Sequence, residues 1–245
     1  SIIQDFSIIH EVLSTSNPHS KTVSYESEAQ FTCEEIRHSE KPISRFQAYV
    51  KSLENILKIN GAPKSSPQVL SKMLAKYNVV LCPSLFIAQA IIWASHNCRY
   101  ITEYVSAKWT SFDNLWNNGL AYIVEKSHEE AGTIHFLVLQ NINISYLPNF
   151  LQPLADLQRG VITKFPKTDI RFPENLRIIC TVAQEELIKM PASILQFFGC
   201  IDKSYQFEIN VPMKFADDAN LGYLTAEELL HESEQEFEIE NMFEQ

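Results

Sequence analysis

Three residues at a strand-to-helix junction are the first candidates for chemistry in this sequence of 245 residues. The segment NVVLCPSLFIAQAII (78–92) predicts an apolar strand, a break at Cys82, Pro83 and Ser84, and then an apolar helix. Many nucleotide-binding folds place a phosphate loop, GxxxxGK[ST], at such a junction, because its N–H groups and its lysine surround the phosphates. This segment has no glycine and no lysine, and Pro83 has no N–H to donate. We therefore expect Ser84 to cap the helix rather than to bind a metal.

The other nucleophilic and metal-binding residue types lack the spacing of a site. The 5 cysteines include no CxxC pair, which predicts buried free thiols in a reducing compartment, and the 7 histidines form no HxH or HExxH pattern. His135 lies in an apolar segment and is expected to be a core residue. Cys82, at the end of a strand and the start of a helix, is the one thiol whose pKa a helix dipole could lower. The sequence thus predicts neither a metal nor a cofactor.

Charge and hydropathy exclude two classes of partner. The net charge is -10, and it resides in the segment after Lys214, which has ten acids and no Lys or Arg. A chain with balanced charge before this acidic segment lacks the basic surface with which nucleic-acid binders contact phosphates. No apolar run reaches the roughly 20 residues that span a bilayer, so we expect a soluble, cytoplasmic protein with no membrane partner. The chain starts at Ser1 with helix-like periodicity, which suggests a processed product or a piece of a longer protein.

Helices and strands that alternate along the chain must position these residues. Helices are expected at 2–13, 41–61 and 66–78, and a half-exposed strand at 21–32; from Val79 onward, near-continuous apolar strands alternate with helices. The predicted fold is therefore α/β, a three-layer parallel sheet with helices on both faces and an N-terminal helix/strand extension. We divide the chain into an extension packing on the core (1–62), the α/β core (63–214) and an acidic tail or helix (215–245).

The order of these pieces resembles an AAA+ ATPase core, in the branch of the GTP-dependent methyl-directed restriction subunits and MoxR-like proteins. NVVLCPS (78–84) matches the Walker A strand and loop, RYITEYVSAKWTSFDNLW (99–116) the second strand, and IHFLVLQNIN (134–143) the Walker B strand. PENLRIICTV (173–182) matches the sensor 1 strand, and MPASILQFFGCID (190–202) the helix that follows it. The resemblance implies a P-loop-like sheet, in which we expect the Walker B and sensor 1 strands to flank the phosphate-loop strand.

The positions where the resemblance places chemistry are all substituted. Cys82, Pro83 and Ser84 replace the phosphate loop, and Gln140 and Asn141 replace the acids that orient magnesium and polarise water. Thr181 remains at sensor 1, but Val182 and Ala183 stand where a water-positioning Asn is expected. Gln196 and Phe197 occupy the arginine-finger position. The resemblance therefore implies a vestigial nucleotide site without catalytic residues, and it argues against nucleotide binding.

Three functions follow from this sequence. The first is a non-catalytic AAA+-like scaffold or regulatory module in a larger cytoplasmic assembly, with a protein partner or further copies of itself. The second is an ATPase or GTPase subunit completed by missing regions or by a partner. The third is an unrelated α/β domain that binds a ligand at the carboxyl edge of its sheet, near Ser84, Gln140 and Thr181.

Two aromatic groups are candidates for contact with a partner. Trp109, Phe112 and Trp116 either pack over the sheet or anchor a protein interface. Phe237 and Phe243 lie among the acids of the tail, which either docks as a helix on a basic partner or is a solvated end.

Overall fold

The computed structural model describes residues 31–43, 45–62, 67–144, 149–182, 196–200, 214 and 221–234. All of these belong to one compact unit, Phe31–Gln245; the other unit, Ser1–Gln30, lies outside the described residues, as do the helix expected at 2–13 and nearly all of the strand expected at 21–32. The elements are β1 (Glu34–Arg37), α2 (Phe46–Ile59), α3 (Pro67–Lys76), β2 (Val79–Cys82), α4 (Leu85–Ala94), β3 (Asn97–Tyr104), α5 (Phe112–Leu115), the π-helix η1 (Trp116–Leu120), α6 (Ala121–Glu129), β4 (Ile134–Gln140), the 3-10 helices η2 (Ile142–Ile144) and η3 (Asn149–Leu151), α7 (Gln152–Gln158), β5 (Leu176–Thr181), β6 (Gly199–Cys200) and α10 (Ala226–Ser233).

The six strands form one mixed sheet in the order β1-β3-β4-β5-β2-β6. Every neighbouring pair is parallel except β1 and β3, so the predicted α/β class with a mostly parallel sheet is confirmed. The sequence did not predict β1, because EEIR is short and charged and shows no apolar alternation. The expected flanking order is corrected: β5 does lie beside β2, but the other neighbour of β2 is β6, and β4 lies one strand further away.

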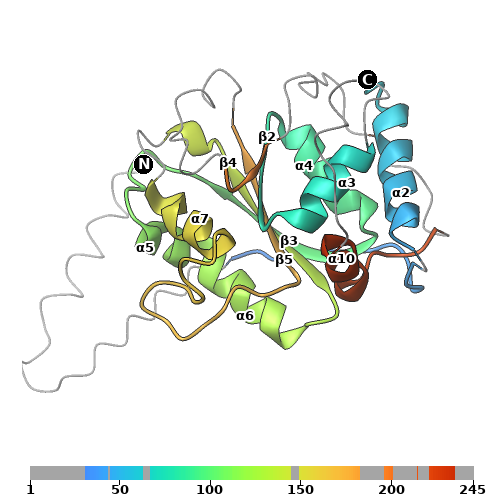
Figure 1. Cartoon of the computed structure of the whole chain (residues 1–245). Coiled ribbons are helices and arrows are strands. Elements are labelled where there is room, and N and C mark those ends of the chain that lie inside the picture. The colour runs from blue at the N-terminus through green and yellow to red at the C-terminus, as the bar shows by residue number, and fades with distance from the viewer. Residues whose placement is uncertain are drawn as a thin grey trace, which may run out of the picture. The chain divides into compact units, whose positions relative to one another are not determined.

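Helices cover both faces of the sheet, as Figure 1 shows. The side chains of α2, α3, α4 and α10 form one buried cluster with one face, and those of α5, α6 and α7 take part in a second cluster on the other. The strand β4 serves both clusters, because Phe136 and Val138 face the first while Leu137 and Leu139 face the second. A strand buried on both faces must be apolar throughout, which explains the continuous run IHFLVLQ.

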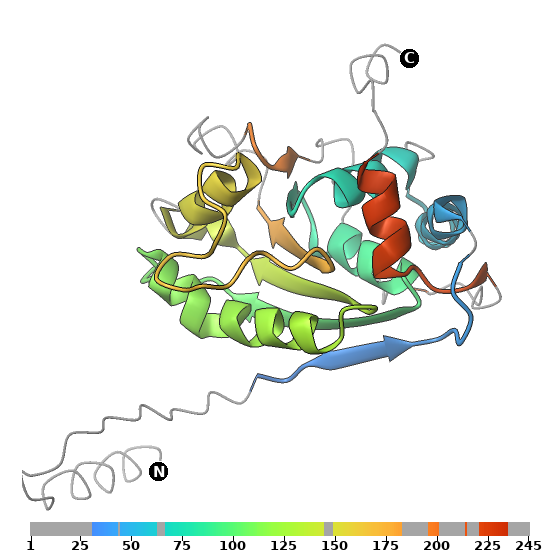
Figure 2. The same ribbon diagram turned by 60° about the horizontal axis from the view of Figure 1, so that its bottom comes forward.

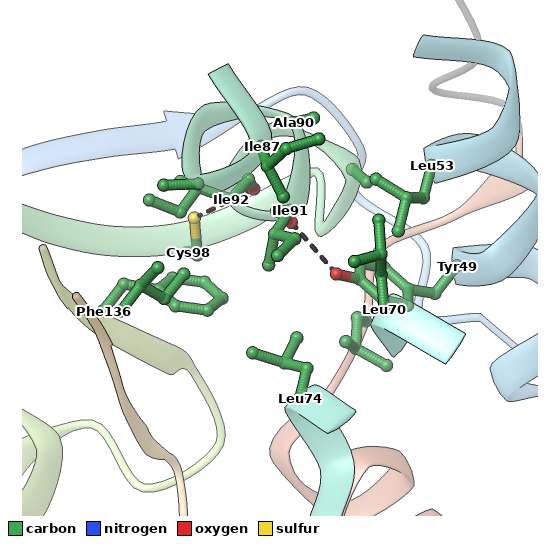
Figure 3. Close-up of a cluster of buried hydrophobic side chains, with 14 of the residues drawn as sticks. Tyr49, Leu53, Leu70, Leu74, Ile87, Ala90, Ile91, Ile92, Cys98 and Phe136 are labelled. Atoms are coloured by element: carbon green, nitrogen blue, oxygen red, sulfur yellow. Dashed lines mark hydrogen bonds between the residues drawn. The ribbon is translucent and has the colours of Figure 1, made fainter. Parts of the chain in front are cut away.

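The first cluster contains its own polar contact. Figure 3 shows the Tyr49 hydroxyl of α2 donating to the carbonyl oxygen of Ile91 in α4, at 3.1 Å. Because Tyr49 is only 1% exposed, this bond supplies the partner that its buried hydroxyl needs. The two helices are thereby fixed by packing and by one directional bond.

The C-terminal helix α10 packs against α2 and α3, beside which Figure 2 also draws it. Thr225 caps α10 by accepting a hydrogen bond from the Glu228 N–H at 3.1 Å, and Leu229 is fully buried. The Glu228 carboxylate in turn accepts a bond of 2.6 Å from the Phe46 N–H at the start of α2, where the N-cap residue Arg45 provides no side-chain bond. The proposed boundaries at 62 and 214 stay predictions.

One segment expected to be helical is partly a strand. Within the helix expected at 190–202, the structure describes residues 196–200, and these form a turn followed by β6. Gly199 permits this because a Cβ there would lie 2.9 Å from the Tyr77 ring. Among the helices that the structure describes, none is long and apolar enough to cross a membrane.

Candidate functional site

The carboxyl ends of four strands place four polar side chains in a row. The parallel register pairs Cys82 with Thr181 and Tyr104 with Gln140. Leu139 pairs with Cys180, so the next positions along, Gln140 and Thr181, also lie side by side. Because side chains alternate along a strand, all four point to the face that α4 covers. We call Cys82, Thr181, Gln140 and Tyr104 the carboxyl-end row.

The junction at the start of the row is closed by local hydrogen bonds. Ser84 has extended backbone angles, and its hydroxyl oxygen accepts from the Ile87 N–H at 3.4 Å, so the predicted helix cap is confirmed. The Cys82 thiol donates to the Ser84 carbonyl oxygen at 3.4 Å. Burial raises the pKa of Cys82 to about 12. The expectation that the helix dipole could lower this pKa is wrong, because at 1% exposure the thiolate loses its hydration.

The middle of the row is held by a bond between neighbouring strand ends. The Thr181 hydroxyl oxygen accepts from the Asn141 N–H at 3.1 Å. Asn141 has a φ of 57°, a left-handed conformation that Asn tolerates better than most residues. The Val182 N–H continues the pairing by donating to the Cys82 carbonyl oxygen at 3.0 Å. Thr181 is therefore used to fix the turn that follows β4.

Gln140 lies between Thr181 and Tyr104 in the row. Its side chain is 9% exposed, and neither of its amide atoms is a fully buried polar atom that lacks a hydrogen-bond partner. Next to it, Tyr104 is 66% exposed. Tyr104 could not be predicted from the sequence, because only the register of β3 against β4 reveals that it completes the row.

The other predicted nucleotide-site residues are not part of this row. Gln196 and Phe197 precede Gly199, which pairs with Val80 near the amino end of β2, so they lie toward the opposite edge of the sheet. The guanidinium carbon of Arg159 lies 4.7 Å from the centre of the Phe197 ring, a cation–π contact within the chain. Ala183 lies outside the described residues.

The predicted interaction residues pack together where the structure describes them. Trp109 and Phe112 are buried, Trp116 is half-buried, and Phe165 lies against both Phe112 and Trp116, with ring centres 6.1 and 5.2 Å away. These aromatic side chains therefore pack within the chain, which is one of the two interpretations given for them. Their role in a protein interface stays a prediction. Phe237 and Phe243 lie outside the described residues.

A buried arginine holds the opposite edge of the sheet, and nothing in the sequence marked it. Arg177 in β5 is only 3% exposed, and burial lowers its pKa to about 10, which still leaves it charged at neutral pH. Its guanidinium donates at 2.7 to 3.2 Å to the backbone carbonyl oxygens of Leu74, Ala75, Glu174 and Leu176. It thereby ties the end of α3 to β5 and has a structural role.

His135 lies on the same β4 strand but is part of the core, as its apolar surroundings predicted. It is fully buried, with Nδ1 3.0 Å from the Thr133 carbonyl oxygen. Burial lowers the pKa of His135. The 3 fully buried thiols, Cys82, Cys98 and Cys180, are free, and no group of acids, histidines and cysteines able to hold a metal occurs within the described ranges.

The carboxyl-end row can form hydrogen bonds but has no group suited to acid–base or metal chemistry. Its thiol is kept protonated by burial, and its hydroxyl, amide and phenol are uncharged. Such groups cannot supply the anionic field that a hard divalent cation needs. Comparison of the chain with protein-family models and with curated proteins gave no match.

Proposed function

We propose that this protein is a non-catalytic AAA+-like domain that acts as a scaffold or regulatory protein-interaction module in a larger cytoplasmic assembly. One observation carries the proposal: the groups at the expected phosphate and magnesium positions are neutral, and most of them bond to one another. The Ser84 hydroxyl caps its own helix, and the Thr181 hydroxyl holds the Asn141 N–H. A nucleotide would have to break these bonds, and none of these groups would offer it a charge in return.

The order of the segments along the chain and the mostly parallel sheet support the AAA+-like part of the proposal. The strand order does not add to this support. β5 flanks β2 as expected, but β4 does not, because β6 lies on the other side of β2.

The chemistry of the row supports the non-catalytic part. Phosphoryl transfer depends on positioning the phosphates and on stabilising developing charge with cations. The junction between β2 and α4 consists of Pro83 and Ser84 alone, so it has too few N–H groups to surround a phosphate. A chain that keeps the core-building strands while losing these groups retains its shape and its surfaces, which a scaffold needs.

Calorimetric titration with ATP and with GTP, each with Mg²⁺, tests this function. We expect no binding in the micromolar range to the purified chain. Binding at micromolar affinity to either nucleotide would overturn the non-catalytic assignment and favour a nucleotide-dependent subunit that other regions complete.

The variant Ser84→Ala makes the test sharper. If Ser84 only caps α4, the variant loses about 1 kcal/mol of stability and its nucleotide titrations stay flat. If Ser84 is a magnesium ligand, wild-type binding of Mg–ATP or Mg–GTP is measurable and the variant weakens it. Thr225→Ala removes a comparable cap on α10 and serves as the matched control.

A further inference from the structure

We propose that the outer edge of β1 is an interface through which two copies of this chain join their sheets into one. This inference rests on the proposed scaffold function and names its partner as a second copy. β1, drawn in blue in Figure 2, ends the sheet, and β3 is its one neighbouring strand among the described residues. An edge strand presents N–H and C=O groups with which a further strand can pair.

The pairing of β1 with β3 determines which of its backbone groups face outward. The His38 N–H donates to the His96 carbonyl oxygen at 2.7 Å, so these two opposed residues form a hydrogen-bonded pair. Bonded and non-bonded pairs alternate along an antiparallel ladder. Ile36 therefore bonds to β3, whereas the N–H and C=O groups of Glu35 and Arg37 point away from it. No described residue bonds to these outward groups.

A two-fold axis at Ile36, perpendicular to the sheet, sets two β1 strands antiparallel with complementary charges. Glu35 then lies opposite Arg37 of the second copy, Arg37 lies opposite Glu35, and Ile36 faces Ile36. The opposed residues are the same ones whose backbone groups point outward, so each Glu35–Arg37 pair exchanges its N–H···O bonds. Opposed side chains lie on the same face of a sheet, where unlike charges attract.

The charges select this register over its neighbours. A shift by two residues in one direction sets Glu35 against Glu35, and the opposite shift sets Arg37 against Arg37, so both shifted registers are repulsive. Within one chain, an Arg37 nitrogen lies 2.9 Å from Glu35 Oε1, and these side chains are 67% and 40% exposed. Both charges are therefore accessible to a second strand. Charged residues often keep other strands away from an edge, but this pair attracts a copy of itself in register.

Sedimentation equilibrium of the full chain tests the proposal. A strand of four residues buries less than the roughly 1,600 Å² of a standard interface, so we expect a dissociation constant on the order of 10–100 µM. The mass of the wild type should rise from that of one chain towards that of two as the concentration increases from about 5 to about 500 µM.

Charge reversals test the register. Arg37→Glu and Glu35→Arg each set like charges opposite one another, so each should weaken self-association at least tenfold. An equimolar mixture of the two variants should associate again, because each glutamate of one variant then faces an arginine of the other. The matched control is Lys51→Glu, which reverses an exposed cation that pairs within its own helix with Glu54 at 2.7 Å, and it should leave association unchanged.

The double variant E35R/R37E keeps an ion pair within the strand and serves if circular dichroism shows that a single variant is unfolded. It should associate with itself but not with the wild type, because mixed pairs would oppose like charges. The proposal is overturned if the wild type stays monomeric at about 500 µM. It is also overturned if the single variants associate like the wild type, if their mixture stays monomeric, or if the double variant forms mixed dimers.

The result is independent of the test of the proposed function. If the chain stays monomeric while the nucleotide titrations stay flat, only the β1 interface is refuted. If nucleotides bind, the non-catalytic assignment is refuted and the sedimentation result stands by itself.

Discussion

Replacing Thr181 by Val is expected to make the protein less stable. The threonine is only 7% exposed, and its hydroxyl oxygen accepts a hydrogen bond of 3.1 Å from the Asn141 N–H. Valine has a similar size but no oxygen, so the variant removes the partner of a backbone donor, which costs about 0.5–1.5 kcal/mol. For a chain of this size, each kcal/mol lowers Tm by about 2–4 °C.

The matched control is Thr102→Val in β3, a half-buried threonine of the same sheet whose hydroxyl forms no hydrogen bond to another described residue. Urea unfolding followed by circular dichroism measures both variants. We expect Thr102→Val to change the free energy of unfolding by less than about 0.5 kcal/mol. Equal effects of the two substitutions would refute the role of the Thr181 hydroxyl in holding the turn after β4.

Three further predictions concern the parts that hold the row in place. Arg177→Met should lower the free energy of unfolding by about 3 kcal/mol, because four carbonyl oxygens lose a buried donor. The control is Arg171→Met, at an exposed position, which should leave urea unfolding unchanged. Equal effects of the two substitutions would contradict the structural role of Arg177. Glu228→Ala should lower the free energy of unfolding by about 1–2 kcal/mol and speed hydrogen exchange at the start of α2. Glu227→Ala, in the same turn of α10, should leave that exchange unchanged. Equal effects of both variants on α2 would contradict the role of the Glu228 carboxylate. Burial lowers the pKa of His135 below its ordinary 6.5, so on acidification the unfolded chain binds the proton first, and the stability contribution present at neutral pH is lost as the pH falls below 6.5. Between pH 7 and 5, the free energy of unfolding should fall by up to about 1.4 kcal/mol per pH unit more in the wild type than in His135→Leu. Thermal unfolding at each pH measures this difference, and parallel curves would contradict the prediction.

The sequence predicted the parallel strands well because their signal is local. A run such as IHFLVLQ must be apolar throughout when helices cover both faces, and β4 is fully buried as that run implies. The Ser84 cap was predictable for the same reason, since a serine before an apolar helix satisfies its first N–H groups. In both cases the residues that decide the outcome are neighbours in the sequence.

Features that depend on distant residues could not be predicted from one sequence. β1 becomes a strand through its antiparallel pairing with β3, although Glu34 and Glu35 give it no apolar pattern. The four carbonyl partners of Arg177 include two from the end of α3, about a hundred positions away in the chain. Only the register of the strands shows that Tyr104 lies beside Gln140 in the row. Such contacts have no local signal, because tertiary packing creates them.

The neutrality of the row fits its burial. An acid at the position of Gln140 would be about nine-tenths buried, where an ionised carboxylate without a cation costs several kcal/mol. The neighbouring junction consists of Pro83 and Ser84 alone, and neither residue supplies a positive charge that would offset this cost. A neutral amide avoids the cost, so the uncharged side chains of the row are the ones that a buried strand edge without a cation tolerates.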